Sequence, residues 1–187
     1  MRCFGDGDPL YERYHDEEWG RPVRDERGLY EKLCLEAFQS GLAWITILRK
    51  RDAFRAAFAD FDPETVARFG KRDVNRLMND AGIVRNRLKV EAAIANAQAA
   101  VDLRDGPQAL PDLIWSHAPP KRRKAPRSWA DVPALTPEST ALAKELKRNG
   151  FRFVGPTTAY ALMQACGLVN DHLAGCRARK IVEDLNH

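Results

Sequence analysis

The chain has 187 residues, a length that suits one domain spanning residues 1–187 and allows a sizeable core. Apolar residues make up 44% and charged residues 30% of it; no run approaches the roughly 18–20 apolar residues of a membrane span, and the N-terminal stretch lacks the apolar region of a secretory signal. This excludes a membrane-spanning protein and indicates a cytoplasmic one, in which cysteine is buried, reactive or metal-bound rather than disulfide-bonded.

Helical periodicity dominates the first half of the chain. Apolar residues recur every three to four positions over residues 29–37, and the pattern resumes after Gly41. Asp62 followed by Pro63 is typical of a helix start. The next segment, "KRDVNRLMNDAG", predicts a helix capped at its end by Gly82.

The second half of the chain is also helical in pattern. Residues 85–103 form a long alanine-rich segment, and Thr136 and Gly150 delimit another predicted helix. A last apolar helix begins around Thr157 and ends at Gly167. Because no segment alternates apolar and polar residues as a strand does, we predict an all-α fold with about eight to ten helices.

The segment 104–133 holds six of the eleven prolines and predicts an irregular surface excursion. Positive charge is concentrated from Lys121 to Arg152, a segment with nine lysines and arginines but only three acidic residues. That segment carries a charge of +6, which leaves about −2 for the rest of a chain whose net charge is +4. This asymmetry fits a nucleic-acid phosphate backbone, but a solvated loop and helix would carry it equally well.

A short turn, "FRFVGP", joins the last two predicted helices. Gly155 has no Cβ, so a ligand can approach its backbone closely. The free N–H groups of Thr157 and Thr158 at the following helix start form an anion site that suits a DNA phosphate. Flanking cations, among them Arg152, favour a DNA-binding helix-hairpin-helix; an ordinary corner between two helices is the alternative.

Glu36 falls within the apolar sector of its predicted helix, about 20° from Leu29 at 100° per residue. A glutamate there must be paired, protonated or reserved for a ligand. Trp44 would lie about two turns beyond Glu36 if the helix continued past Gly41. Such aromatic residues line either a core or a pocket; they are Phe4, Tyr11, Tyr14, Trp19 and Trp44.

One cysteine and one histidine stand near each end of the chain. Cys3 and His15 lie in the N-terminal stretch, and His172 and Cys176 are four apart, a spacing that brings them to one face of a helix. Two cysteines and two histidines form a common tetrahedral zinc set. Neither spacing is that of a zinc finger, so buried, unliganded side chains remain the alternative.

Four stretches together carry a resemblance to a known family: "DPLYERYHDEEWG", "LCLEAFQSGLAWITIL", "DAGIVRNRLKVEAAIANA" and "GFRFVGPTTAYALMQACGLVNDHLAGC". They extend from Asp8 to Cys176, nearly the whole chain, and resemble the bacterial 3-methyladenine DNA glycosylases I. The resemblance implies the helix-hairpin-helix glycosylase fold and the release of 3-methyladenine from alkylated double-stranded DNA. We expect a monomer with DNA, and no membrane, as its partner.

The resemblance also implies roles for individual residues. Glu36, Tyr14 and Trp44 match the base pocket, with Glu36 as the catalytic residue. Gly155, Thr157, Thr158 and Arg152 would hold the DNA backbone, and the structural zinc ligands would be Cys3, His15, His172 and Cys176. The helix "TTAYALMQAC" contains no lysine, the residue with which strand-cutting relatives form a Schiff base, so we expect a monofunctional glycosylase.

Two departures from the family pattern concern the pocket. Phe4 stands near the place where the family has a tryptophan, and we expect Phe4 to take over its packing and contact the base. Ala37 and Phe38 follow Glu36 where glycine and glutamine are usual. Other hypotheses remain open from the residues alone: a glycosylase for another lesion, a non-catalytic DNA binder, or a zinc-stabilised helical protein with a protein partner. Asp171 is expected to cap a helix before His172 rather than to act in catalysis.

Overall fold

The computed structural model describes residues 1–120 and 124–185, and this part of the chain contains helices and no β-strand. In chain order the helices, with the short 3-10 helices named η, are α1 (Pro9–Glu17), α2 (Glu26–Gln39), α3 (Trp44–Ala57), η1 (Ala59–Phe61), α4 (Pro63–Ala67), α5 (Lys71–Met78), α6 (Arg87–Arg104), α7 (Leu110–Ser116), η2 (Trp129–Asp131), α8 (Pro137–Arg148), α9 (Pro156–Ala165) and α10 (Ala178–Leu185). The predicted all-α fold is confirmed for the described residues.

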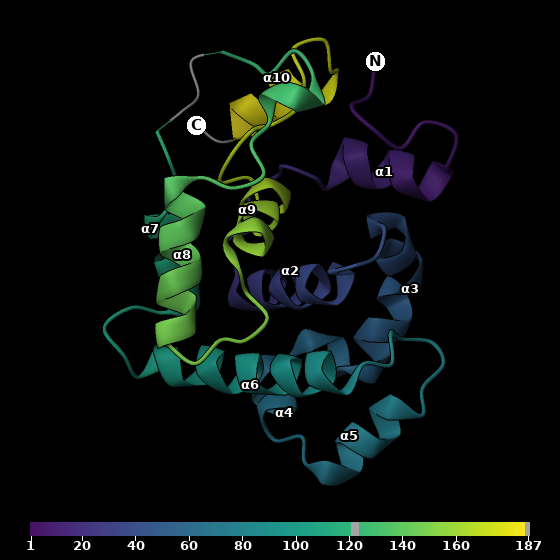
Figure 1. The fold of residues 1–187 in the computed structure, drawn as a ribbon, viewed down its shortest axis with the longest axis vertical. Helices are drawn as coiled ribbons and strands as arrows, with labels where there is room; N and C mark the ends of the chain where they lie inside the picture. Colours follow the sequence, from purple (N-terminus) through teal and green to yellow (C-terminus); the bar gives the residue numbers. More distant parts are fainter. Residues whose placement is uncertain (121–123, 186–187) are drawn as a thin grey trace.

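Helix α2 lies at the centre of the molecule, with α6 crossing below it and α9 above it (Figure 1). It also contacts α3 and α7, and nine of its 14 residues are buried. A helix covered on all sides buries polar positions together with apolar ones. This is why both Lys32 and Glu36 lie inside the protein. The N-terminus and α10 lie at the same end of the molecule (Figure 1).

Helix α6 confirms the predicted alanine-rich helix. Ala93 and Ala97 are buried where α6 meets α2, and their small side chains allow the two backbones to approach closely. The hydroxyl of Tyr30 on α2 donates a hydrogen bond to the carbonyl of Ala93, at 2.8 Å. The contact fixes α2, and with it Glu36, against the longest helix of the fold.

Helix α2 stops at Gln39, so the helix does not continue past Gly41 and the two-turn spacing of Glu36 and Trp44 does not apply. Gly41 adopts a φ of +83°, a left-handed conformation that ends the helix and that glycine tolerates best. The ammonium of Lys89 on α6 bonds the last carbonyls of α2, those of Phe38 and Ser40, at 2.9 and 2.7 Å. Trp44 instead begins α3.

Two predicted helix starts are confirmed. The side chain of Asp62 accepts from the amide of Thr65, and that of Thr136 accepts from the amide of Ser139. A proline follows each cap in the first turn. Gly150 lies just past the end of α8, as predicted.

The predicted helix end at Gly82 is wrong. Helix α5 ends at Met78 with Asn79 as its C-cap, and the Asn79 amide donates to the carbonyl of Asn75 at 2.9 Å. Gly82 lies in the next turn, where its N–H donates to the carboxylate of Asp80 at 2.8 Å. The side chains of Asn79 and Asp80 hydrogen-bond to nearby backbone groups and so compete with the helical pattern. The helix therefore ends before the glycine.

The segment 104–133 is not irregular throughout, which corrects the prediction. Leu110–Ser116 forms helix α7, whose apolar side chains enter the core against α2 and α6. Pro111 is compatible with this helix because it stands in the first turn, where its missing N–H costs no hydrogen bond. From 117 to 133 the described residues contain only the short η2.

Helix α10 was not predicted; it lies at the same end of the fold as the N-terminus (Figure 1). Two residues of α10 are buried, Ala178 and Val182, and they hold the helix against the rest of the fold. Among the described residues, no helix combines the length and the apolar character that crossing a membrane requires.

Candidate active site

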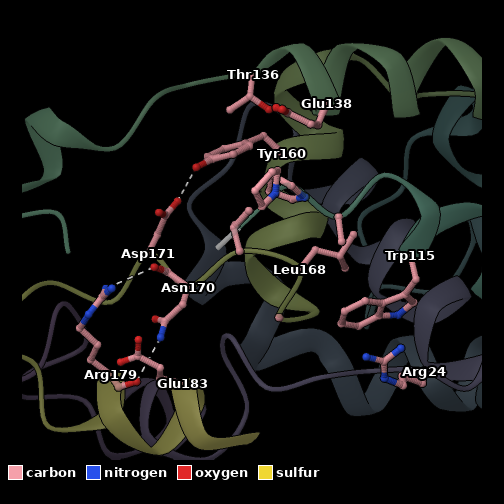
Figure 2. A pocket seen from close by; sticks show the side chains of 15 residues that line it. Arg24, Trp115, Thr136, Glu138, Tyr160, Leu168, Asn170, Asp171, Arg179 and Glu183 are labelled. Atoms are coloured by element: carbon pink, nitrogen blue, oxygen red, sulfur yellow. Dashed lines mark hydrogen bonds between the residues drawn. The ribbon is translucent and has the colours of Figure 1, made fainter. Parts of the chain in front are cut away.

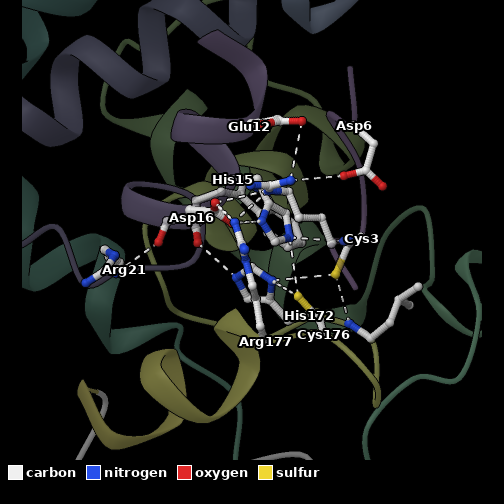
Figure 3. Close-up of polar contacts among 12 residues, drawn as sticks. Cys3, Asp6, Glu12, His15, Asp16, Arg21, His172, Cys176 and Arg177 are labelled. Carbon is white, nitrogen blue, oxygen red and sulfur yellow. Dashed lines mark hydrogen bonds and ion pairs between the residues drawn. The ribbon is translucent and has the colours of Figure 1, made fainter. Parts of the chain in front are cut away.

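Ligand-bearing side chains from the two ends of the chain meet at one point (Figure 3). One ligand atom from each of Cys3, His15, His172 and Cys176 lies within 4.8 Å of the others. The Sγ of Cys176 is 3.3 Å from Nε2 of His15 and 3.4 Å from Nδ1 of His172, and the Sγ of Cys3 is 3.6 Å from that Nδ1. Zinc bond lengths imply sulfur–nitrogen separations of about 3.6 Å around a tetrahedral ion. The cluster therefore fits a metal ion.

His172 and Cys176 come together in a loop, not on a helix, which corrects the interpretation of their spacing. The N–H of Cys176 donates to the carbonyl of Leu173 at 2.8 Å, so a tight turn brings the two ligands to the same side. The N–H of Leu173 points to the sulfur of Cys3 at 3.2 Å. Burial raises the pKa of the Cys3 thiol to about 12, and this contact partly opposes the rise by favouring the thiolate, the form that binds metals.

One ring nitrogen of each histidine contacts an oxygen acceptor. The other, Nε2 of His15 or Nδ1 of His172, faces the sulfur of Cys176, and Nε2 of His15 also lies 3.1 Å from the N–H of Cys3. Nδ1 of His15 lies 2.9 Å from the carboxylate of Asp16, and Nε2 of His172 lies 3.1 Å from the carbonyl of Trp19. Burial lowers the pKa of His172 to about 4, so its imidazole is neutral at pH 7. Acceptors of this kind orient histidine ligands in metal sites.

Glu36 is a buried glutamate, only 6% exposed to solvent. Burial raises its pKa to about 7, and the nearby charge of Lys32, one helical turn earlier, partly opposes that rise. The structure thus confirms that Glu36 lies within the apolar side of its helix, with the charge of Lys32 nearby. Carboxylates held near pH 7 by burial are typical of functional sites.

The sequence did not indicate that Lys32 is buried near Glu36, since a lysine one turn before a glutamate usually marks a solvated helix face. Its ammonium is buried, lies 4.9 Å from the ring centre of Tyr14 and has no hydrogen-bond partner among the described residues. Glu18 approaches it to 3.6 Å, but two bonds at 2.5 and 2.9 Å bind Glu18 to Arg51. Lys32 therefore contributes its charge to the surroundings of Glu36.

The predicted pocket aromatics come together although they belong to three segments. Tyr14 on α1 and Trp44 at the start of α3 have ring centres 5.3 Å apart. Burial, and next the charge of Glu36, raise the pKa of the Tyr14 hydroxyl. Phe4 lies 6.4 Å from Tyr14 and 5.1 Å from Trp19. The indole N–H of Trp44 is buried without an acceptor among the described residues, so a polar donor remains for a ligand.

Phe38 is separate from this cluster. Its ring packs in the core against Phe54 and Phe58, with centres 4.6 and 5.9 Å apart. Position 38 lies about 200° around α2 from Glu36, on the opposite face of the helix. The departure at Ala37 and Phe38 thus changes the core more than the surroundings of the carboxylate.

Two hydrogen bonds from helix α6 hold the turn between α8 and α9, a contact that no sequence pattern indicated. Buried Asn96 on α6 accepts from the N–H of Arg152 at 2.7 Å and donates to its carbonyl at 3.2 Å. Space is open beside the Cα of Gly155, and no side chain caps the N-terminus of α9. Its first intrahelical bond after the cap comes from Ala159, which leaves the N–H groups of the two threonines before it available.

The basic segment presents its charges to solvent wherever the structure describes it. Lys121, Arg122 and Arg123 lie outside the described residues. The remaining lysines and arginines of the segment are exposed: Lys124, Arg127, Lys144, Lys147, Arg148 and Arg152. Exposure meets the first requirement of a phosphate-binding face, and it is equally compatible with a solvated one.

Asp171 lines a different cavity, of about 460 Å³, that does not include Glu36, Tyr14 or Trp44 (Figure 2). Its carboxylate accepts from the Tyr160 hydroxyl at 2.5 Å and from the Gln164 amide at 3.0 Å. The expected helix-capping role of Asp171 is wrong, because no helix begins there. Its bonds tie the loop that carries His172 to α9.

A sequence model of the methyladenine glycosylase family matches residues 4–180. Over 172 residues the chain is 48% identical to DNA-3-methyladenine glycosylase 1 of Escherichia coli K12, covering 90% of this chain and 91% of that protein. Its structure is similar to a crystal structure of 3-methyladenine DNA glycosylase I, with a TM-score of 0.92, 46% identity and coverage of 96% and 100% of the two chains.

A third similar protein is the 3-methyladenine DNA glycosylase I of Staphylococcus aureus, from a structural study of 3-methyladenine recognition. Its TM-score is 0.89 at 37% identity, and the match covers 95% of each chain. The similarity extends over nearly the whole length of each of these proteins.

Burial of Glu36 predicts a pH-dependent loss of stability. The folded pKa of about 7 lies above the ordinary value of 4.5, so the folded state holds the proton more tightly and stability falls as pH rises between these values. Between pH 5 and pH 8 we expect Glu36→Gln to gain about 2–3 kcal/mol relative to the native chain. Urea unfolding at both pH values measures this difference. Glu91→Gln, an exposed site, is the control, and an equal response of the two variants would refute the assignment.

Proposed function

Because the chain belongs to the methyladenine glycosylase family, we propose that it is a monofunctional DNA-3-methyladenine glycosylase of base excision repair. It flips the alkylated nucleotide out of the duplex, hydrolyses its N-glycosidic bond and leaves an abasic site. One chain supplies every residue that we assign, so the enzyme acts as a monomer on bacterial cytoplasmic DNA. The observation that carries the proposal is the buried carboxylate of Glu36 near Tyr14, whose ring contacts that of Trp44.

The pocket suits a cationic purine. Methylation at N3 leaves adenine in DNA with a positive charge, whereas unmodified adenine is neutral. Aromatic rings such as Tyr14 and Trp44 attract a desolvated cation by about 1–2 kcal/mol each, and Phe4 extends this wall. Glu36 accepts hydrogen bonds from the exocyclic amine side of the base. Neutral adenine gains much less from either interaction, so the pocket selects the damaged base.

Glu36 and the substrate influence each other's charge. A pKa of about 7 without a ligand means that both forms of the carboxyl are populated near neutral pH. A cation beside the carboxylate favours the ionised form. Binding of the alkylated base therefore favours the carboxylate form of Glu36, which the nearby ammonium of Lys32 already favours in part without a ligand.

Hydrolysis follows from the charge of the base. When the bond between sugar and base breaks, its electron pair stays with the purine, which becomes neutral. The sugar carbon takes a hydroxyl from water, and the water's second proton is released. Because the leaving group is already cationic, the protein need supply less stabilisation than for a neutral base. The neutral product loses part of its attraction to Glu36 and the rings, which favours its release.

DNA is held by the turn between α8 and α9, which we assign as a helix-hairpin-helix. The available N–H groups of Thr157 and Thr158 and the open space at Gly155 suit a phosphate oxygen. Exposed Arg152 adds positive charge beside them. These contacts position the duplex without reading its sequence, which suits a repair enzyme that finds damage anywhere.

We assign the cluster of Cys3, His15, His172 and Cys176 to one structural zinc ion. The donor set and the sulfur–nitrogen separations of 3.3 to 3.6 Å support zinc. Four protein ligands leave no position for water, so the ion would supply stability rather than catalysis. His15 directly follows Tyr14, and fixing His15 therefore fixes a wall of the base pocket.

Replacement of Glu36 tests the function. Glu36→Gln keeps the shape of the side chain and removes its charge, so we expect release of 3-methyladenine from methylated DNA to fall at least a hundredfold, or by about 3 kcal/mol in transition-state stabilisation. Chromatography of the released base measures the rate and identifies the base. Glu91→Gln should retain native activity. Release at near-native rate by Glu36→Gln would remove Glu36 from the mechanism.

Metal analysis tests the zinc assignment. We expect about one zinc per chain in the native protein and loss of zinc in Cys176→Ser. The melting temperature of this variant should also fall, because the metal no longer joins Cys176 to His15, 161 positions earlier in the chain. Cys34→Ala alters a buried cysteine outside the cluster and should retain zinc. A native protein that is metal-free and equally stable would contradict the assignment.

Borohydride trapping tests the monofunctional assignment. Helix α9, where strand-cutting relatives are expected to carry the Schiff-base lysine, has no lysine. We therefore expect no covalent adduct between the enzyme and abasic DNA in the presence of borohydride. A trapped complex would overturn this assignment, and repeating the reaction with Lys32→Met would show whether Lys32 supplies the amine.

A further inference from the structure

Trp129 joins the segment 104–133 to the aromatic cluster of the N-terminus. It begins η2, and its indole N–H donates to the carbonyl of Cys3 at 3.2 Å. The carbonyl of Pro126 accepts from the N–H of Ala174 at 2.8 Å, which holds the same segment against the C-terminal loop. Two distant parts of the chain thus fix the position of Trp129.

The Trp129 ring is the exposed outer member of a connected series of rings. Its centre lies 6.2 Å from Phe4 and 6.2 Å from Trp19. Phe4 is in turn 6.4 Å from Tyr14, which contacts Trp44. The series therefore reaches from the pocket wall to the protein surface, where 44% of Trp129 remains exposed.

Exposure of this indole is unfavourable unless something covers it. Burial of a tryptophan ring contributes to stability, and much of that contribution is lost at an exposed position. Exposed Lys124 and Arg127 precede Trp129 by five and two residues. An aromatic ring next to exposed cations is the arrangement that binds nucleotides, with the base on the ring and the phosphates on the cations.

We propose that Trp129 is a substrate-contacting residue that stacks on the extruded alkylated base at the mouth of the pocket. The inference rests on the proposed glycosylase function and extends the set of base-contacting residues beyond Glu36, Tyr14 and Trp44. Indole is the aromatic group with the strongest attraction to a cation, so Trp129 favours the methylated base over the neutral one. The segment 104–133 then contributes to base selection as well as to the core.

Two substitutions separate stacking from anchoring. Trp129→Ala removes both the ring and the hydrogen bond to Cys3, whereas Trp129→Phe removes only the hydrogen bond and retains a ring. We expect Trp129→Ala to lower kcat/KM for 3-methyladenine release from methylated DNA about five- to tenfold, and Trp129→Phe about twofold or less. The dissociation constant for a duplex with a reduced abasic-site analogue, which has no base at that position, should stay within twofold of native for both variants.

Three results would overturn the proposal. Native kcat/KM in Trp129→Ala would show that the ring contributes nothing. An equal loss in both variants would assign the effect to the hydrogen bond with Cys3. A matching loss of affinity for the abasic duplex would move the contact from the base to the neighbouring DNA. If the native enzyme itself releases no 3-methyladenine, the proposed function fails instead, and the two failures are distinct.

Discussion

The convergence of the two chain ends at Cys3, His15, His172 and Cys176 is the constraint on which the rest of the site depends. His15 lies on α1 immediately after Tyr14, and α1 contacts α3, which begins with Trp44. Fixing the cluster therefore sets the distance between the two rings. The metal ion that we propose at this cluster would join residues far apart in the chain and hold in place ends that otherwise fray.

Helix α2 has to accommodate two opposing requirements. Its central position makes it the core of the fold, and the same position desolvates Lys32 and Glu36. Desolvation holds the pKa of Glu36 near the working pH at a cost in stability. Aromatic packing of Phe38 on the other face of the helix offsets part of that cost. The residues that stabilise α2 and the one that we assign to chemistry thus lie on opposite sides of one helix.

Helix α9 links the two proposed contacts with DNA. It begins with the N–H groups that we assign to a phosphate, and its last residue, Ala165, packs with Tyr14, Trp19 and Leu48. A helix of ten residues is about 15 Å long, so it acts as a rigid spacer between backbone and base. Asn96 holds the turn before this helix and so sets its start relative to α6.

The sequence by itself determined the helical class, several helix starts and the burial of Glu36, because periodicity and capping are local properties of the chain. Its family resemblance also identified the activity. Only the tertiary structure decided that Lys32 lies buried beside Glu36 and that Trp129 meets Phe4. The physical reason is that these contacts join segments far apart or depend on which faces of a helix are covered, and no local pattern records either.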